Sequence, residues 1–527
     1  MTSQTSSSAP PQRATARSSH ARDWGAGFFV KLFLMCLVNA LGIYGALTAY
    51  QVGNLPLAIS MVVLLLVVNY IYFARKRIAG KYLIPGLVFL LIYQVFVMGY
   101  TGYVALTNYG QGHNSTKDDA ITQILRQNEK RVEGSESVPV VPIDRDGEIG
   151  LALLIDGKIM VGDAQTPLSE AQGTIDGTRI TAVDGATLIT GKTLNQRQKE
   201  VFAVRVPVSD EVDAQTYRTE TGATAFLSTS IYRYDEAADT LTNTETGVTY
   251  TAGKNGQFEA PGEKPLTPGW RVVVGFENFT KMFSDSQLAM PFLRAFLWSL
   301  AFAFLSVAST FVVGLVLAVI YNDPRVRGRT IYRSLFILPY AFPAFLSALV
   351  WRGMFNQGHG IINQVILGGA DIAWLDNEWL AKGVILLVNM WLGFPYMFLV
   401  CTGALQAVPE DVKEAAVIDG AGAMRIFRSI TAPLVFVATA PLLIASFAFN
   451  FNNFSLIYML TDGGPNYEGL PYAVGKTDLL ISMVYGISFD GAQKQYGLGA
   501  AMSIIIFVVV GLISWFGFRA TRKLEEI

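Results

Sequence analysis

The stretch VPEDVKEAAVIDGAGAMRIFRSITAPL, residues 408–434, is a polar segment that separates two apolar runs of membrane length. Pro409 followed by two acids is typical of a helix start, because acids are favourable near the positive end of the helix dipole. Gly420 and Gly422 then interrupt the helix before it resumes. The stretch predicts a helix–turn–helix between two spans. It could lie on the bilayer surface, or its small side chains could let a partner protein approach the backbone.

The composition around this stretch is that of a membrane protein. Of 527 residues, 51% are hydrophobic and only 15% are charged, against about 25% charged residues in soluble domains. Runs of about 20 apolar residues, the length that crosses a bilayer, predict an α-helical polytopic membrane protein with eight transmembrane helices. We expect them near Phe28–Tyr50, Leu55–Phe73, Tyr82–Leu106, Phe292–Tyr321, Leu335–Met354, Gly383–Leu405, Leu434–Leu460 and Leu498–Phe518.

Lysine and arginine gather in alternate short loops, which predicts the orientation of the chain. Clusters occur before residue 23, at residues 75–81, at residues 325–333, within residues 408–433 and after residue 518. Because cytoplasmic loops carry an excess of these residues, both termini are expected in the cytoplasm. The first run is longer than a usual signal sequence and has no clear cleavage site, so we expect an uncleaved anchor.

The predicted organisation follows from the spans and their orientation. It comprises a disordered cytoplasmic tail (residues 1–24), helices one to three (25–107), an extracytoplasmic domain and linker (108–290), helices four to eight with the loop of residues 408–433 (291–520), and a cytoplasmic tail (521–527).

The long segment between the third and fourth spans is too large to lack a fold of its own. Between Tyr109 and Met290 it holds 26 acidic and 17 basic residues. LALLIDGKIMVGD, residues 151–163, reads as two apolar strands joined through Asp156 and Gly157. We therefore expect a mainly β domain inserted between the third and fourth helices.

Several site classes are disfavoured by the sequence. The two cysteines lie in apolar runs and the three histidines are isolated, so we expect neither a disulfide framework nor a metal site. No basic domain suits nucleic acid. The segment of residues 185–193 resembles a phosphate-binding loop, but five residues rather than four separate its two glycines. Nor does any triad of residues predict an enzyme active site.

The loop of residues 408–433 resembles the EAA loop of ATP-binding-cassette (ABC) importer permeases. The resemblance rests on Glu414-Ala415-Ala416, Asp419-Gly420-Ala421 and Ile430-x-x-Pro433 at full spacing. In that family the loop is a coupling helix that docks in the ATPase subunit, which implies a polar contact from Glu414 and a turn at Gly420. The implied coupling set is Glu414, Ala415, Ala416, Asp419, Gly420 and Ala421. Ala432 departs from the family, which commonly has leucine there.

Most of the chain resembles the larger permease subunit of bacterial maltose/maltodextrin importers. Beside the overall plan, the resemblance rests on GFENF (275–279), SFAFNFNNF (446–454), TDGGP (461–465) and KTDLL (476–480). It implies a permease core in the bacterial inner membrane with several partners: a second homologous permease, a homodimeric ATP-binding subunit that binds ATP and Mg, and an extracytoplasmic sugar-binding protein. Maltose or maltodextrin would be the cargo, with no cofactor in this chain.

Three asparagines stand in the apolar run of residues 445–460. On a helix Ser446, Asn450 and Asn453 share one face, whereas Asn452 points elsewhere. The amides could bridge neighbouring spans, at about 1 kcal/mol each. They could equally form a sugar pocket, because an amide supplies both the donor and the acceptor that a hydroxyl needs.

The sixth span carries WLGFPYMF, residues 391–398. We expect Gly393 and Pro395 to disturb the helix midway and expose backbone, with Tyr396 offering a ring and a hydroxyl. In the resembling family, the matching positions that line the transmembrane maltose site are Leu392, Gly393, Tyr396, Ser446, Phe449, Asn450 and Asn453. The resemblance favours the sugar pocket over interhelical bridges.

Three rival functions differ in what they require. A secondary sugar carrier usually needs ionisable residues inside its spans, and this chain has almost none. A receptor needs a cytoplasmic output domain, and no predicted cytoplasmic segment is long enough. An importer of another oligosaccharide stays open, because the orientation of one hydroxyl can change substrate preference.

Overall fold

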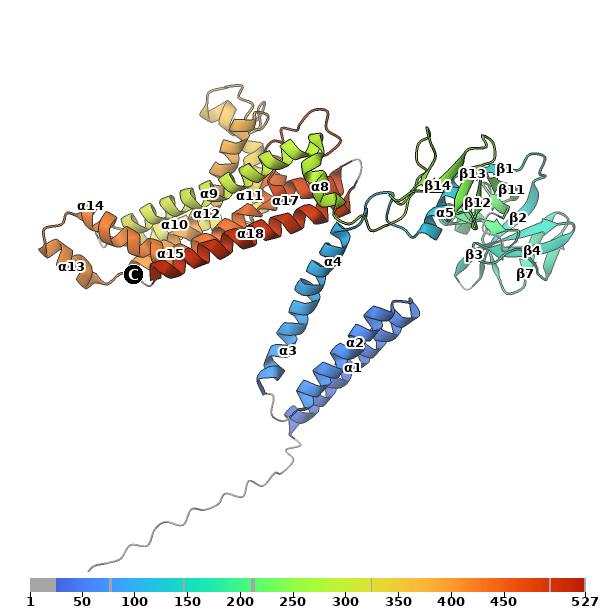
Figure 1. The fold of residues 1–527 in the computed structure, drawn as a ribbon, viewed down its shortest axis with the longest axis horizontal. Coiled ribbons are helices and arrows are strands. Elements are labelled where there is room, and N and C mark those ends of the chain that lie inside the picture. The colour runs from blue at the N-terminus through green and yellow to red at the C-terminus, as the bar shows by residue number, and fades with distance from the viewer. Residues whose placement is uncertain are drawn as a thin grey trace, which may run out of the picture. The chain divides into compact units, whose positions relative to one another are not determined.

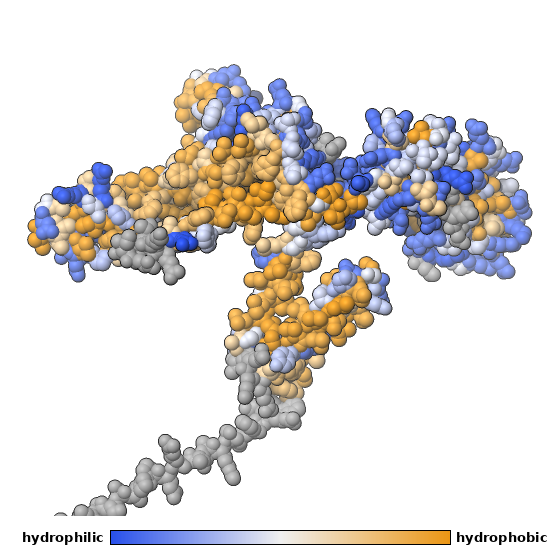
Figure 2. Space-filling model, in the orientation of Figure 1, coloured by the Kyte–Doolittle hydropathy of each residue, from blue (hydrophilic) through white to orange (hydrophobic). Residues whose placement is uncertain are grey.

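The computed structural model describes residues 25–74, 78–145, 147–209, 214–323, 325–491 and 494–525, so the predicted tail of residues 1–24 lies outside the described part. Within that part, seven helices are long and apolar enough to cross a membrane, and eight if one bent pair counts as a single span. Hydrophobic residues cover these helices, and hydrophilic residues gather over the β-rich domain (Figure 2). The predicted fold class is confirmed.

Residues up to Gly99 form one compact unit and those from Tyr100 another. In the first unit, α1 (Ala26–Gln51) and α2 (Leu55–Phe73) form a hairpin. The amides of Asn39 and Asn69 exchange hydrogen bonds of 3.0 and 2.6 Å across it. The third predicted span comprises α3 (Ile78–Leu90), the π-helical η1 (Leu91–Phe96) and α4 (Val97–Ala105), the last of which continues into the second unit.

The inserted domain is mainly β, as predicted (Figure 1). Its largest sheet has the order β5-β4-β3-β2-β11-β10-β9, with β1 and β8 paired at its side. The predicted hairpin exists, and both Asp156 (φ 49°) and Gly157 (φ 76°) adopt the left-handed turn geometry that closes it.

The elements of this domain have the following bounds: α5 Lys117–Gln127, β1 Glu129–Arg131, β2 Val138–Arg145, β3 Glu148–Ile155, β4 Lys158–Asp163, β5 Ser169–Glu170, β6 Gly173–Asp176, β7 Arg179–Val183, β8 Thr187–Leu188, α6 Gly191–Gln196, α7 Gln198–Ala203, β9 Val206–Pro207, β10 Thr216–Thr219, β11 Thr224–Ser230, β12 Tyr232–Asp235, β13 Thr240–Asn243, β14 Thr249–Ala252 and β15 Phe258–Glu259.

The two ends of the inserted domain join the helical core through a stalk, which we define as residues 107–113 and 269–275. Asn108 accepts from the backbone of Val272 at 2.8 Å, and Gln111 donates its backbone N–H to Lys494 at 2.7 Å. Asn278 donates to the carbonyl of Thr107 at 2.8 Å. The stalk is thereby bonded to itself, to α8 and to the segment before the last helix.

The core begins at residue 277 and contains the remaining helices: α8 Glu277–Ser284, α9 Ser286–Asn322, α10 Arg329–Ala341, α11 Ala344–Met354, η2 Ile362–Ile366, α12 Glu378–Gln406, α13 Glu410–Ile418, α14 Ala423–Ile426, η3 Phe427–Thr431, α15 Ala432–Phe451, α16 Phe454–Leu460, α17 Leu480–Tyr485, η4 Gly486–Asp490 and α18 Tyr496–Glu525.

Three predicted spans differ in detail. The fifth is the bent pair α10 and α11, which meet at 91° where extended Phe342 precedes Pro343, because a residue before proline avoids helical geometry. The sixth was expected to break near Gly393, but α12 continues through it as a helix. The seventh ends at Phe451, and α16 starts a separate helix after it.

Close contact between α9 and α12 explains two glycines of the core. A Cβ on Gly393 would stand 2.8 Å from Cγ2 of Thr310, and one on Gly314 would stand 2.7 Å from the backbone of Met397. Gly393 therefore permits the two helices to approach each other, which is its observed role in place of the predicted break.

Candidate functional site

A cavity of about 540 Å³ lies among α9, α10, α11, α12, α15 and α16. Its volume falls within the range of about 300–1,000 Å³ that is usual for small-molecule sites. All seven residues predicted from the sequence line it, namely Leu392, Gly393, Tyr396, Ser446, Phe449, Asn450 and Asn453. Asn452 does not line it and instead donates to the carbonyl of Ala448 at 3.3 Å.

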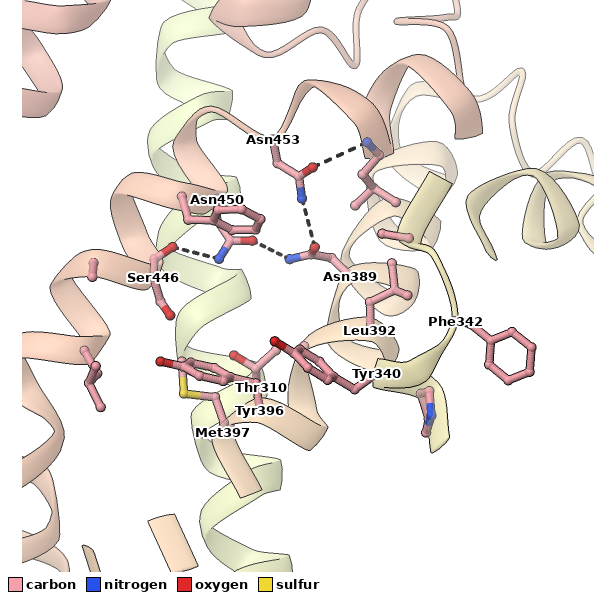
Figure 3. A pocket seen from close by; sticks show the side chains of 17 residues that line it. Thr310, Tyr340, Phe342, Asn389, Leu392, Tyr396, Met397, Ser446, Asn450 and Asn453 are labelled. Carbon is pink, nitrogen blue, oxygen red and sulfur yellow. Dashed lines mark hydrogen bonds between the residues drawn. The ribbon is translucent and has the colours of Figure 1, made fainter. Parts of the chain in front are cut away.

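Three asparagine side chains join across one wall of this cavity (Figure 3). Asn389 donates to Oδ1 of Asn450 at 2.8 Å, and Asn453 donates to Oδ1 of Asn389 at 3.2 Å. Asn450 also donates to the carbonyl of Ser446 at 2.8 Å. These bonds link α12 to the end of α15 and the start of α16. The same residues therefore both bridge the helices and line the cavity.

Asn453 reaches the cavity by a different route from the one predicted. It was expected on the helical face of Ser446 and Asn450, but α15 stops at Phe451. Asn453 is the N-cap of α16, where its Oδ1 accepts from the backbone of Leu456 at 3.4 Å. Asparagine is among the favoured N-cap residues because its side chain satisfies a free backbone N–H.

Asn389 is a site residue that the sequence analysis missed. It is 6% exposed and forms the centre of the asparagine cluster. A signal was present, because Asn389, Leu392, Gly393 and Tyr396 follow the spacing of a single helix face. An amide inside an apolar span at that spacing could have been added to the predicted pocket.

Aromatic side chains lie across the cavity from the asparagines. Figure 3 shows the rings of Tyr340 and Tyr396 on that side, and Phe342 also belongs to the lining. Phe449 is 72% exposed and leaves its ring free for contact. No charged residue occurs among the described residues that line the cavity. The arrangement suits a neutral ligand with hydroxyl groups and apolar C–H faces.

The predicted coupling residues lie on and just after α13, an exposed helix (Figure 1). Glu414, Ala415 and Ala416 belong to α13, Asp419 is its C-cap, and Gly420 and Ala421 form the turn before α14. Gly420 has φ +79°, a geometry that side chains disfavour.

Large apolar side chains of this loop are also exposed, including Ile418 at 86% and Met424 at 69%. Exposed apolar side chains beside charged ones are typical of a protein interface.

The two sequence motifs after α16 form one loop around a buried carboxyl. Asp478 accepts from the backbone of Gly475 and from the hydroxyl of Ser482, both at 2.7 Å. Gly463 lies so close that a side chain there would collide with Asp478. Burial raises the pKa of Asp478 to about 6. The two motifs, TDGGP and KTDLL, therefore contact each other in the structure.

Two family models match the chain. One describes the N-terminal part of the transmembrane subunit in binding-protein-dependent ABC transporters and matches residues 88–165. The other describes the inner membrane component of binding-protein-dependent transport systems and matches residues 310–524.

Similar proteins cover nearly the whole chain. The maltose/maltodextrin transport system permease protein MalF of Vibrio parahaemolyticus is 34% identical over 94% of this chain and 96% of its own length. MalF of Escherichia coli K12 is 34% identical over 92% and 96%, respectively. A solved chain of a bacterial alginate importer shows 21% identity over 47% of this chain and 84% of its own, with a TM-score of 0.41.

Identity at this level over nearly the full length of both chains, together with the two family models, decides the family. This multi-span chain belongs to the MalF family of permease proteins, the inner-membrane components of binding-protein-dependent ABC transporters.

Proposed function

We propose that this chain forms one half of the membrane pathway of an ATP-driven importer of maltose or maltodextrins, and that the cavity around Asn450 holds the sugar. The observation that carries the proposal is the uncharged cavity, in which Asn389, Asn450 and Asn453 face two tyrosine rings. A glucosyl unit needs hydrogen-bond partners for its hydroxyls and apolar faces for its C–H groups, and this cavity offers both.

The asparagine cluster supplies groups that a sugar can use. Each side-chain amide has two N–H donors and an oxygen with two lone pairs. In Asn389, the bonds to Asn450 and Asn453 occupy one donor and one acceptor position. A sugar hydroxyl can use the free positions or take over one of these bonds, which leaves no buried amide without a partner.

The partners in the proposal follow from the family and from the loop around α13. A second, homologous permease completes the pathway, and a sugar-binding protein delivers the cargo outside the membrane. A homodimeric ATPase binds ATP and Mg and receives α13, where Glu414 and the exposed Ile418 form the contact. The excess of lysine and arginine in alternate loops supports a topology with the termini and α13 in the cytoplasm and the inserted domain outside.

Uptake of labelled maltose by vesicles that hold the complete assembly tests the proposal. Binding protein is supplied outside and ATP inside, and wild type is compared with Asn450→Ala. We expect ATP-dependent uptake to fall about tenfold or more, since the substitution removes sugar contacts and leaves Asn389 short of a partner, a loss of about 1–3 kcal/mol.

Asn452→Ala is the matched control, because Asn452 lies close in sequence but outside the cavity. It should leave uptake unchanged, and both variants should assemble with wild-type yield. Equal uptake by Asn450→Ala and wild type would contradict sugar binding in this cavity. An active wild-type assembly that ignores maltose but imports another oligosaccharide would keep the importer and change the cargo.

A further inference from the structure

Ser306 of α9 carries a buried hydroxyl that the proposed function leaves unexplained. The residue is 0% exposed, and its Oγ has no hydrogen-bond partner among the described residues. Its neighbours on the helix differ: Ser309 and Thr310 both donate to the carbonyl of Ser306, at 3.1 and 2.7 Å. Leaving a buried hydroxyl without a partner costs free energy, so its position needs a reason.

The packing of α9 on α12 shows what faces this hydroxyl. Thr310 contacts the position of Gly393, and Gly314 contacts Met397. The two helices therefore meet at positions four residues apart on each, and they run in the same direction. One more turn brings Ser306 opposite Asn389.

Neighbouring turns of the two helices support this register. Phe302 and Ile385 belong to one buried cluster, and Ala318 and Cys401 belong to another. Figure 3 shows the α9 ribbon, in pale green, passing behind the cavity wall that holds Asn450.

Asn389 is the central member of the asparagine cluster. It donates to Asn450 and accepts from Asn453, and these two bonds leave one N–H and one lone pair of its amide unused. An amide whose two partners both turn toward a ligand would be free to rotate. A neighbouring hydroxyl can donate to the amide oxygen or accept from the amide N–H, so it can hold the amide in either orientation.

We propose that Ser306 is a positioning residue for sugar binding: its hydroxyl takes a hydrogen bond with the Asn389 amide when a sugar draws Asn450 or Asn453 away. The inference rests on the proposed function. Without sugar the hydroxyl is spare, and with sugar bound it fixes the orientation of Asn389. Its contribution therefore belongs to the sugar-bound state alone.

The test compares Ser306→Ala with Ser309→Ala in the complete assembly, through the KM and kcat of maltose uptake and the melting temperature without sugar. We expect Ser306→Ala to raise KM about three- to tenfold, the effect of one hydrogen bond, with little change in kcat. The melting temperature should stay equal or rise, because a spare buried hydroxyl has gone. Ser309→Ala should leave KM unchanged.

A second comparison uses Asn389→Ala as the background. Because Ser306 acts through Asn389, adding Ser306→Ala to that background should change KM no further. An additive effect would overturn the inference.

An unchanged KM and a lower melting temperature for Ser306→Ala would also overturn the inference. That result would mean that the hydroxyl bonds the carbonyl of Phe302, one turn earlier on the helix. Uptake that is lost in Asn450→Ala but unaffected by Ser306→Ala refutes only the role of Ser306. A wild-type assembly that does not import maltose refutes the proposed function for this sugar and the inference with it.

Discussion

At the scale of single residues, Gly393 shows how the wall of the cavity depends on helix packing. The missing side chain leaves room for Cγ2 of Thr310, and both residues line the cavity. The distance between α9 and α12 at this level is therefore fixed by a glycine on one helix and a methyl group on the other.

Gly393→Ala should destabilise the core, because the new Cβ would meet the Thr310 methyl group at 2.8 Å. Overpacking of this kind costs about 1–3 kcal/mol, which a lower melting temperature of the purified assembly would report. Thr310→Ser removes that methyl group and should restore most of the loss in the double variant. If the double variant melts no higher than Gly393→Ala alone, this contact is not the cause.

At the scale of elements, the loop between α12 and α15 stands out for its lack of burial. No residue of α13 is buried, and Ile418 is 86% exposed. A helix of nine residues is marginal in isolation, so we infer that α13 gains stability when a partner covers it.

Glu414→Lys should weaken the docking of the ATPase. The substitution reverses the charge at the proposed polar contact, so we expect less ATPase to co-purify with the permease and ATP hydrolysis to lose its dependence on sugar. Glu410→Lys makes the same reversal one turn earlier, at the first residue of α13, and should have the smaller effect. Wild-type co-purification of Glu414→Lys would argue against α13 as the docking element.

At the scale of the whole molecule, the inserted domain and the core meet through the stalk. Gly497 donates its backbone N–H to the carbonyl of Tyr109 at 2.8 Å, and Gly269 donates to Gly112 at 2.6 Å. The first end of the domain is thus held at the start of α18, and the second end is bonded to the first.

Deletion of residues 114–261 should therefore keep the core intact, since Gln111, Val272 and their bonds remain. We expect normal membrane insertion and normal co-purification of the partner subunits, with a large loss of uptake driven by the binding protein. Equal uptake by the truncated and complete assemblies would contradict a role of the domain in engaging the binding protein.

Local patterns of sequence predicted most helices and one turn well. The length of apolar runs suffices for α1, α2 and α9, because hydrocarbon admits only backbones that satisfy their own hydrogen bonds. Asp156-Gly157 specified its turn through backbone geometry alone. The break after Phe451 and the role of Gly393 escaped prediction, because both depend on which helix lies opposite.

The candidate pocket was predicted through family positions rather than through local pattern. Its seven expected residues do line one cavity, but Asn389 was missed because an amide becomes informative only once its partners are known. Whether the cavity holds sugar stays a prediction for the uptake experiment.

The asparagine cluster also bears on how long a ligand stays. The amides already bond to one another, so under the proposed function a sugar hydroxyl exchanges partners with them instead of satisfying groups that had none. Each exchange gains little net free energy, about 1 kcal/mol, and a shallow well means a fast dissociation rate. Under the proposed function, the chemistry of this wall therefore favours a short residence time of the sugar.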